Sequence, residues 1–150
     1  MLYRQLEEFD LTLTLDENQK RLVEAAAAAR LRSVAPFSKF LVGAAVETKE
    51  GRIYTGCNIE SASYGLTVCA ERVAIWKAIS EGERNLTNLA VVVDTEPLTP
   101  PCGTCRQIMW EFCNDGYIIL ANLDGHAEQL AIGDLQPRAF DARFLELKRK

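Results

Sequence analysis

The residues best able to do chemistry stand in two short segments, "VCAER" and "PPCGTC". In the first segment, the thiol of Cys69 is followed by the acid Glu71 and then by the base Arg72. In the second, Cys102 and Cys105 form a C-x-x-C pair, whose spacing places both thiols on one face of a helical turn. Such a pair serves either redox chemistry or half of a zinc site, and alone it leaves this choice open.

The position of Cys69 favours a metal site. Both cysteine segments begin predicted helices, and the dipole and free N–H groups at a helix N-terminus favour thiolates. If the two helices lie side by side on one face of a sheet, their three sulfurs can converge on one ion. Three protein ligands leave one tetrahedral position for water, as in catalytic zinc sites, whereas structural zinc sites have four. We therefore predict that Cys69, Cys102 and Cys105 bind one zinc ion.

The other two cysteines are less suited to the metal. Cys57 falls in a predicted strand, and Cys113 falls at the far end of the helix that begins near Cys105. Free cysteines often behave as small buried apolar residues, so we expect both to be packing residues. With five cysteines in all, an odd number, a disulfide framework is not expected.

Glu71 and Arg72 complete the predicted site. Glu near a helix N-terminus can simply complement the helix dipole. However, a ligand, one residue, a Glu that is not a ligand, and then P-C-x-x-C is the arrangement of zinc nucleobase deaminases, which include a three-cysteine variant. Glu71 is therefore the predicted catalytic residue, which takes a proton from the zinc-activated water. Because three thiolates leave the site negative, we expect Arg72, one helical turn after Cys69, to offset their charge.

Composition limits the classes of protein that need to be considered. With 150 residues, 48% apolar and 25% charged, the chain is predicted to form a single domain, residues 1–150. The net charge is −4, and the one basic cluster is the final "KRK", which opposes a nucleic-acid partner. No apolar run is long enough to span a bilayer, so no membrane partner is expected. The N-terminal segment does not resemble a signal peptide, which predicts a cytoplasmic protein.

Periodicity and turn residues predict the elements that position these residues. The expected helices and strands alternate, which predicts an α/β domain with a mixed sheet of about five strands and helices on both faces. The lone His126 falls at a predicted turn tip and is given no role. The expected helices cover 16–34, 69–80 and 103–113, and the expected strands lie within 40–60 (two strands joined by a turn at 49–51), 88–94, 117–122 and 128–133.

Three segments in this order, "FSKFLVGAAV", "GCNIESASYGLTVCAER" and "PPCGTCRQ", resemble the zinc-dependent cytidine deaminases that act on free nucleosides. The resemblance covers about residues 35–140. It implies the three-layer fold of that family, one zinc per subunit, and a homotetramer with its sites near subunit interfaces. It also implies hydrolytic deamination of cytidine and 2′-deoxycytidine to uridine and 2′-deoxyuridine, with release of ammonia, as in pyrimidine salvage. Residues 1–15 form an N-terminal extension for which no role is predicted.

The resemblance also implies substrate-binding residues. Phe40 is expected to pack against the pyrimidine, and Asn58 and Glu60 to hydrogen-bond the ribose hydroxyls. Ala70 is expected to offer a backbone group to the edge of the base. Phe140 corresponds to an aromatic residue that reaches the site of a neighbouring subunit.

Some residues depart from the family pattern. Pro100 stands where Ser is usual, although its carbonyl group can still contact the exocyclic amine, while Leu41 replaces a common Pro and Gln136 a common Leu. None of these changes falls on a predicted zinc ligand or on Glu71.

Features of the sequence oppose three alternative functions. The first is deamination of another cytosine nucleoside such as blasticidin S, which the intact ribose pair Asn58 and Glu60 opposes. The second is a nucleic-acid cytosine deaminase, which the acidic composition and the lack of basic or aromatic tracts oppose. The third is a structural zinc module, which a site with three protein ligands opposes.

Overall fold

Five strands form one mixed sheet, as the sequence predicts. The structure is a computed structural model that describes residues 14–146. The strand order is β2-β1-β3-β4-β5, in which β3 and β4 are parallel and the other neighbours are antiparallel. The strands are β1 Val42–Thr48, β2 Ile53–Cys57, β3 Leu86–Val93, β4 Tyr117–Ala121 and β5 Ala127–Ala131.

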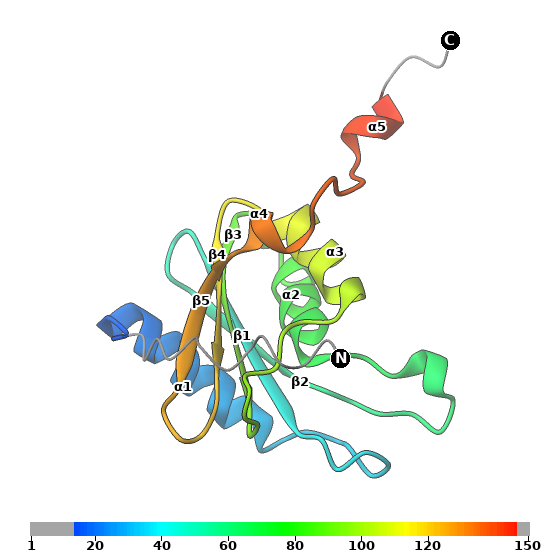
Figure 1. Ribbon diagram of the computed structural model, residues 1–150. Helices are drawn as coiled ribbons and strands as arrows, with labels where there is room; N and C mark the ends of the chain where they lie inside the picture. Colours follow the sequence, from blue (N-terminus) through cyan, green and yellow to red (C-terminus); the bar gives the residue numbers. More distant parts are fainter. Residues whose placement is uncertain (1–13, 147–150) are drawn as a thin grey trace, which may run out of the picture.

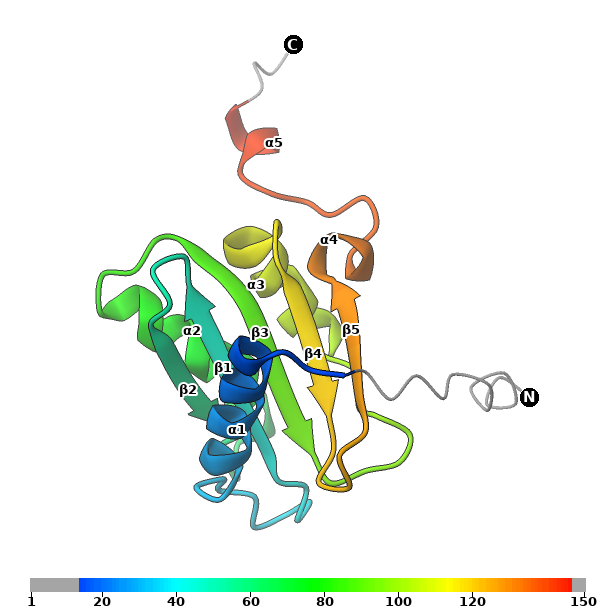
Figure 2. The same cartoon turned by 90° about the vertical axis from the view of Figure 1, so that its left-hand side faces the viewer.

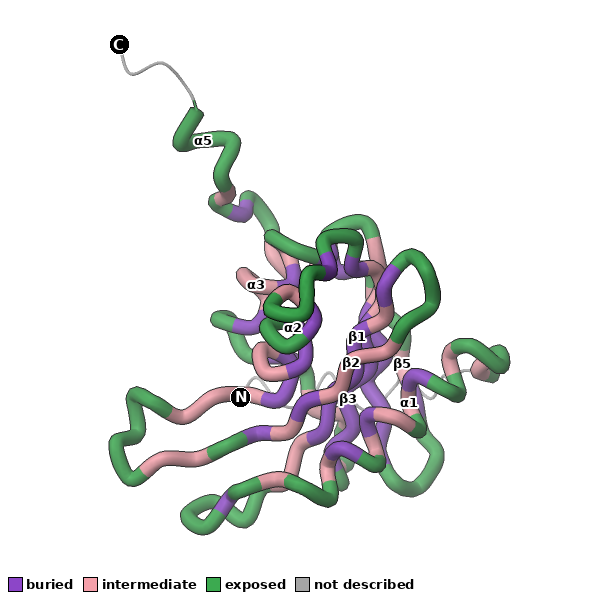
Figure 3. Tube along the Cα trace, turned by 180° about the vertical axis from the view of Figure 1, so that it is seen from behind, coloured by how far each residue is buried: buried purple, intermediate pink, exposed green. Residues whose placement is uncertain are grey.

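Helices cover both faces of this sheet, which confirms the three-layer prediction. Two helices, α2 (Ala70–Ser80) and α3 (Gly103–Cys113), lie on one face, and α1 (Glu17–Arg30) lies on the other (Figures 1 and 2). Because successive strand residues point to opposite faces, β3 supplies Leu89 and Val91 to the first layer and Ala90 and Val92 to the second. The three inner strands β1, β3 and β4 are mostly buried between the layers, whereas β2 and β5 are more exposed (Figure 3).

Glycines let the helices approach the sheet closely. A Cβ atom at Gly43 would lie 2.0 Å from the carbonyl oxygen of Ala26 in α1. A Cβ atom at Gly56 would lie 2.5 Å from both the carbonyl oxygen of Ala70 and the amide nitrogen of Ala74 in α2. The start of α2 is therefore seated directly on β2.

The remaining boundaries include two corrections. Helix α1 begins after Asp16, whose carboxylate accepts a hydrogen bond from the Gln19 amide, but it ends at Arg30 instead of residue 34. The predicted strand 128–133 is also too long, because the chain leaves the sheet at Ala131 and forms the short helix α4, Ile132–Leu135. Ile132 is buried in the core as the first residue of α4, so its apolar character does not show where the strand ends.

Besides α4, two short helices in the described residues were not predicted. A 3-10 turn, η1 (Tyr64–Leu66), lies in the long loop before α2, and α5 (Arg143–Glu146) projects away from the body of the protein (Figure 1). Residues 14–146 contain no helix long and apolar enough to cross a membrane. Of the predicted extension 1–15, residues 1–13 lie outside the described residues.

Candidate active site

Strand register brings the two cysteine segments to one edge of the sheet. Strand β1 is antiparallel to both β2 and β3, with Gly43 opposite Cys57 and Val42 opposite Val93. The last residues of β2 and β3 therefore meet at the same edge, beside the start of β1. The chain that follows each of these strands leads to α2 and α3, so both helices begin near this edge.

Three sulfurs converge there. Cys69 is the N-cap residue of α2, Cys102 is the N-cap residue of α3, and Cys105 lies in the first turn of α3. Their Sγ atoms all lie within 4.8 Å of one another, and those of Cys69 and Cys102 are 3.8 Å apart. Cys105 is buried, Cys69 is half-buried and Cys102 is exposed, so the cluster is reachable from solvent on one side.

The cluster fits zinc. With Zn–S distances of about 2.3 Å, tetrahedral coordination separates two sulfurs by about 3.8 Å, which matches the Cys69–Cys102 spacing. Three thiolates are soft ligands of the kind that select zinc over magnesium or calcium. Cys57 and Cys113 are not members of the cluster. Cys57 ends β2, where its thiol donates to the Arg32 carbonyl, and Cys113 is buried in the core, where burial raises its pKa to about 12.

The surroundings favour a thiolate at Cys69. A hydrogen bond with the Cys105 thiol, followed by the interaction with the Arg72 guanidinium, lowers the pKa of Cys69 to about 5. The pKa of Cys105 is raised, because its thiol is the partner in that hydrogen bond and because it is buried. Arg72 Nη2 lies 3.7 Å from Cys69 Sγ, and the guanidinium stacks over Trp76 at 5.6 Å from the ring centroid. Arg72 is thus placed beside the sulfurs, as expected from its spacing. Arg106, by contrast, donates to the carbonyl oxygen of Pro101.

Glu71 is the buried acid of the site. Only 4% of its surface is exposed, although it lies in the first turn of α2, two residues after the half-buried Cys69. Burial raises the pKa of its carboxyl group, and the charge of Cys69 acts in the same direction. A carboxyl group whose pKa is raised holds a proton more readily, which suits it to accept and return protons.

The expected ribose-binding residues are engaged with the protein itself. Asn58 is 8% exposed; its Nδ2 donates to the Phe40 carbonyl at 2.7 Å, and its Oδ1 accepts from the Val42 amide at 2.9 Å. Glu60 accepts hydrogen bonds from the amides of Phe37 and Ser38 at 2.8 and 3.2 Å. The ring of Phe40 is partly exposed. Sequence reasoning did not identify the contacts that hold the loop around Phe40.

Ala70 and Phe140 occupy different environments. Ala70, the first residue of α2, is completely buried against β2, so it can offer only backbone groups. Phe140 is 58% exposed, and its ring stacks on that of Phe144 at 5.8 Å. Within this chain, it lies in the segment that leads to α5.

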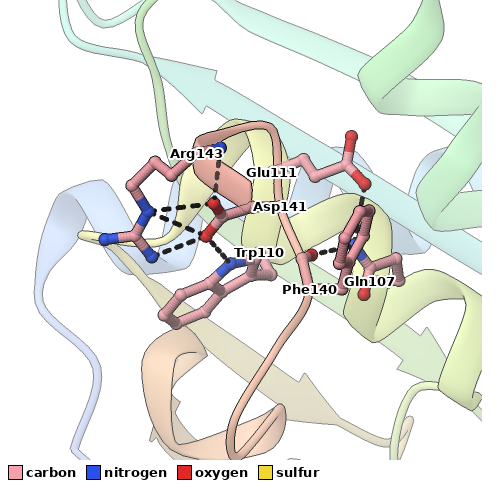
Figure 4. A network of polar contacts seen from close by, with 6 residues as sticks. All are labelled: Gln107, Trp110, Glu111, Phe140, Asp141 and Arg143. Atoms are coloured by element: carbon pink, nitrogen blue, oxygen red, sulfur yellow. Dashed lines mark hydrogen bonds and ion pairs between the residues drawn. The ribbon is translucent and has the colours of Figure 1, made fainter. Parts of the chain in front are cut away.

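A polar network ties the Phe140 segment to α3 (Figure 4). Gln107 Nε2 donates to the carbonyl oxygen of Phe140 at 2.7 Å, and Trp110 Nε1 donates to Asp141 Oδ2 at 3.1 Å. Arg143 pairs with the same carboxylate, and this pairing holds the pKa of Asp141 well below its usual range. The helix that begins with two zinc-ligand candidates therefore also fixes the segment that carries Phe140. The sequence gives no local signal of this network.

His126 lies in the β4–β5 turn, as predicted. Its side chain is 54% exposed, and Nδ1 lies 2.8 Å from Glu96 Oε2. Glu96 also accepts a hydrogen bond from Asn122, so the histidine helps to join this turn to the loop between β3 and α3.

Comparison with known proteins agrees with this geometry. Residues 16–121 match the family model of the cytidine and deoxycytidylate deaminase zinc-binding region, and the chain belongs to this family. A cytidine deaminase from Halalkalibacterium halodurans is 47% identical over 126 residues, which are 83% of this chain and 96% of that protein. The crystal structure of a cytidine deaminase from Burkholderia pseudomallei aligns with a TM-score of 0.78 at 44% identity, covering 81% of this chain and 98% of that one. A blasticidin-S deaminase from Bacillus cereus is 29% identical over 134 residues, 84% of this chain and 94% of that protein.

Proposed function

We propose that the protein is a zinc-dependent hydrolase that converts cytidine and 2′-deoxycytidine, with water, to uridine and 2′-deoxyuridine and ammonia. The observation that carries this proposal is the convergence of three thiols at two helix N-termini beside the buried acid Glu71. The identity to cytidine deaminases over most of the chain supports the choice of reaction and substrate.

Cys69, Cys102 and Cys105 are the proposed zinc ligands, one ion per chain. When bound, zinc supplies Lewis acidity that lowers the pKa of a coordinated water toward neutrality. Arg72 offsets the charge of the thiolates through its contact with Cys69, which keeps the site from becoming too electron-rich.

Glu71 is the proposed proton carrier. Its carboxylate takes a proton from the attacking water and delivers it to N3 of the cytosine ring as the C4–O bond forms. The same carboxylate then takes the second proton from the new C4 hydroxyl group and supplies it to the departing amine, so that the C4–N bond breaks with release of ammonia and a C4 carbonyl group forms. The burial of Glu71 favours this cycle, because desolvation raises the pKa of its carboxyl group and so favours the protonated form that the cycle passes through.

Substrate recognition is assigned to residues at the same edge of the sheet. Phe40 packs against the pyrimidine. Asn58 and Glu60 bind the ribose through the donor and acceptor positions that their hydrogen bonds within the protein do not use. The backbone of Ala70 reads the edge of the base, and the Pro100 carbonyl accepts from the exocyclic amine.

We also infer that the protein works as a homotetramer in the cytoplasm. The protruding loop before α2 exposes Tyr64 (76%) and Leu66 (75%), and the C-terminal segment exposes Phe140 and Phe144. Exposed apolar groups of this kind mark surfaces that other subunits can cover, and the family resemblance implies that Phe140 reaches a neighbouring site. The five free thiols favour a reducing compartment. Sedimentation of the purified protein measures the subunit number, and a monomer at micromolar concentration would contradict this assembly.

The variant Glu71→Gln tests the proposed function. Gln is nearly isosteric with Glu but cannot take a proton from water, so turnover should fall by ~10²–10⁴-fold or more. Bound zinc should stay at about one ion per chain, because Glu71 is not a ligand. The assay measures ammonia from cytidine, deoxycytidine, cytosine and blasticidin S on one preparation. Near-normal turnover would show that Glu71 only complements the helix dipole. Loss of zinc would show that Glu71 is a zinc ligand.

A further inference from the structure

Glu60 holds the loop that precedes β1. Its Oε2 accepts hydrogen bonds from the amides of Phe37 and Ser38, and its Oε1 accepts a short hydrogen bond from the Ser38 hydroxyl group. The bond with Ser38 is also the main reason why the pKa of Glu60 lies below its usual value. A carboxylate offers about four acceptor positions, so about one remains for a ligand.

Ser38 continues this chain of hydrogen bonds to Phe40. While its hydroxyl group donates to Glu60, its Oγ accepts from the amide of Phe40 at 3.0 Å. The carbonyl group of Phe40 is held at the other side by Asn58 Nδ2, at 2.7 Å. The Phe40 carbonyl group is thus bound to Asn58, and the Phe40 amide is connected to Glu60 through Ser38. Asn58 and Glu60 are the two residues proposed to bind ribose.

The backbone between Ser38 and Phe40 needs such support. Lys39 has φ = 60°, in the left-handed region that residues other than glycine rarely adopt. Residues in this region persist when surrounding contacts hold them there, and such residues cluster at binding sites. Apart from the Lys39 amide, which donates to the Ala35 carbonyl, the hydrogen bonds that residues 38–40 make within the described part of the chain run through Ser38, Glu60 and Asn58.

We propose that Ser38 is a positioning residue that couples the ribose-binding carboxylate of Glu60 to the base-packing ring of Phe40. This inference rests on the proposed function. It means that sugar and base are recognised by one connected network. A ribose hydroxyl group takes the remaining acceptor position of Glu60 without releasing the loop, and the loop in turn presents the Phe40 ring to the pyrimidine.

The test is a double-mutant cycle with the variants Ser38→Ala and Phe40→Ala, in which activity is measured as the release of ammonia from cytidine. Ser38→Ala should raise the KM for cytidine about five- to tenfold, the equivalent of one lost hydrogen bond, with kcat within about twofold of wild type. In the Phe40→Ala background the same change should alter KM by less than about twofold, because Ser38 then has no ring to position. Ser38→Thr, which keeps the hydroxyl group, should restore KM.

Ser80→Ala is the matched control, because the Ser80 hydroxyl group donates to Lys77 at the far end of α2 and its loss should leave KM unchanged. Hydrogen exchange adds a readout that needs no substrate: Ser38→Ala should speed exchange of the Phe40 amide and leave the amides of β3 protected. Unchanged KM in Ser38→Ala, or an equal rise in KM in the Phe40→Ala background, would overturn the coupling while the proposed function stands. If the wild-type protein releases no ammonia from cytidine, the proposed function itself is refuted.

Discussion

Replacing Gly56 with Ala should displace the start of helix α2. The added Cβ atom would lie 2.5 Å from the Ala70 carbonyl oxygen and from the Ala74 amide nitrogen, and 2.9 Å from Val73 Cβ. Ordinary contacts of a Cβ atom begin near 3.4 Å, so the start of α2 must move by roughly 1 Å away from β2. Gly56 lies in a regular strand without positive φ, so Ala itself fits the backbone and the crowding is the whole effect.

The displaced part of α2 carries both Cys69 and Glu71, whereas Cys102 and Cys105 belong to α3. A misplacement of about 1 Å can lower a rate by about 10²-fold, so kcat/KM for cytidine should fall by about that factor. Crowding a packed interior typically destabilises by about 1–3 kcal/mol, which urea unfolding measures directly.

A second glycine supplies the control for this experiment. At Gly133 a Cβ atom would come no closer than 3.7 Å to any atom, so Gly133→Ala should leave both kcat/KM and stability close to those of the wild type. If Gly56→Ala kept kcat/KM within about threefold of wild type, the close seating of α2 on β2 would not be what positions the site.

Three further perturbations probe the site and its support. Cys102→Ala should lower bound zinc well below one ion per chain, measured by atomic absorption, whereas Cys57→Ala should keep it; equal zinc in both would remove Cys102 from the ligand set. Arg72→Gln should keep the fold but lower kcat and shift its pH profile upward, because uncompensated thiolates weaken zinc as an acid; an unchanged profile would show that Arg72 does not act on the metal. Asp141→Asn should lower stability at neutral pH, because the lowered pKa of Asp141 means that its charged form stabilises the fold. That contribution is present above the unfolded-state pKa of about 3.9 and is lost as the pH falls toward the lower folded-state pKa, so the difference from wild type should shrink in urea unfolding curves below pH 4. A difference that did not depend on pH would assign the effect to packing.

The predictions that succeeded rest on local patterns. The apolar runs of β3 and β4 and the cysteines at two helix starts are visible in the sequence, because strands and helix N-termini have characteristic compositions. The convergence of the thiols followed from assuming two helices on one face, which the sheet topology confirms.

What could not be predicted depends on contacts between distant segments. Asp141 reaches Trp110 across 31 residues, and Glu60 reaches Ser38 across 22 residues. In neither pair does the separation along the sequence indicate that the two side chains are in contact. The left-handed conformation of Lys39 is equally hidden, because lysine has no preference for positive φ and only the folded loop imposes it.

Helices α2 and α3 differ from α1 in how they begin. Asp16 caps α1 with a reciprocal pair of hydrogen bonds, whereas Cys69 and Cys102 occupy the N-cap positions of α2 and α3 and make no capping hydrogen bond with their side chains. Lack of a good N-cap costs a helix about 0.5–2 kcal/mol.

A chain selected for stability alone would place Asp or Ser at both positions, and it would lose two of the three thiols that we propose as zinc ligands. Activity and stability therefore compete at the same two residues. Zinc binding resolves the competition, because the free energy of metal binding also stabilises the folded state. The stability of the folded protein in a cell then depends on the supply of zinc as well as on the packing of its core.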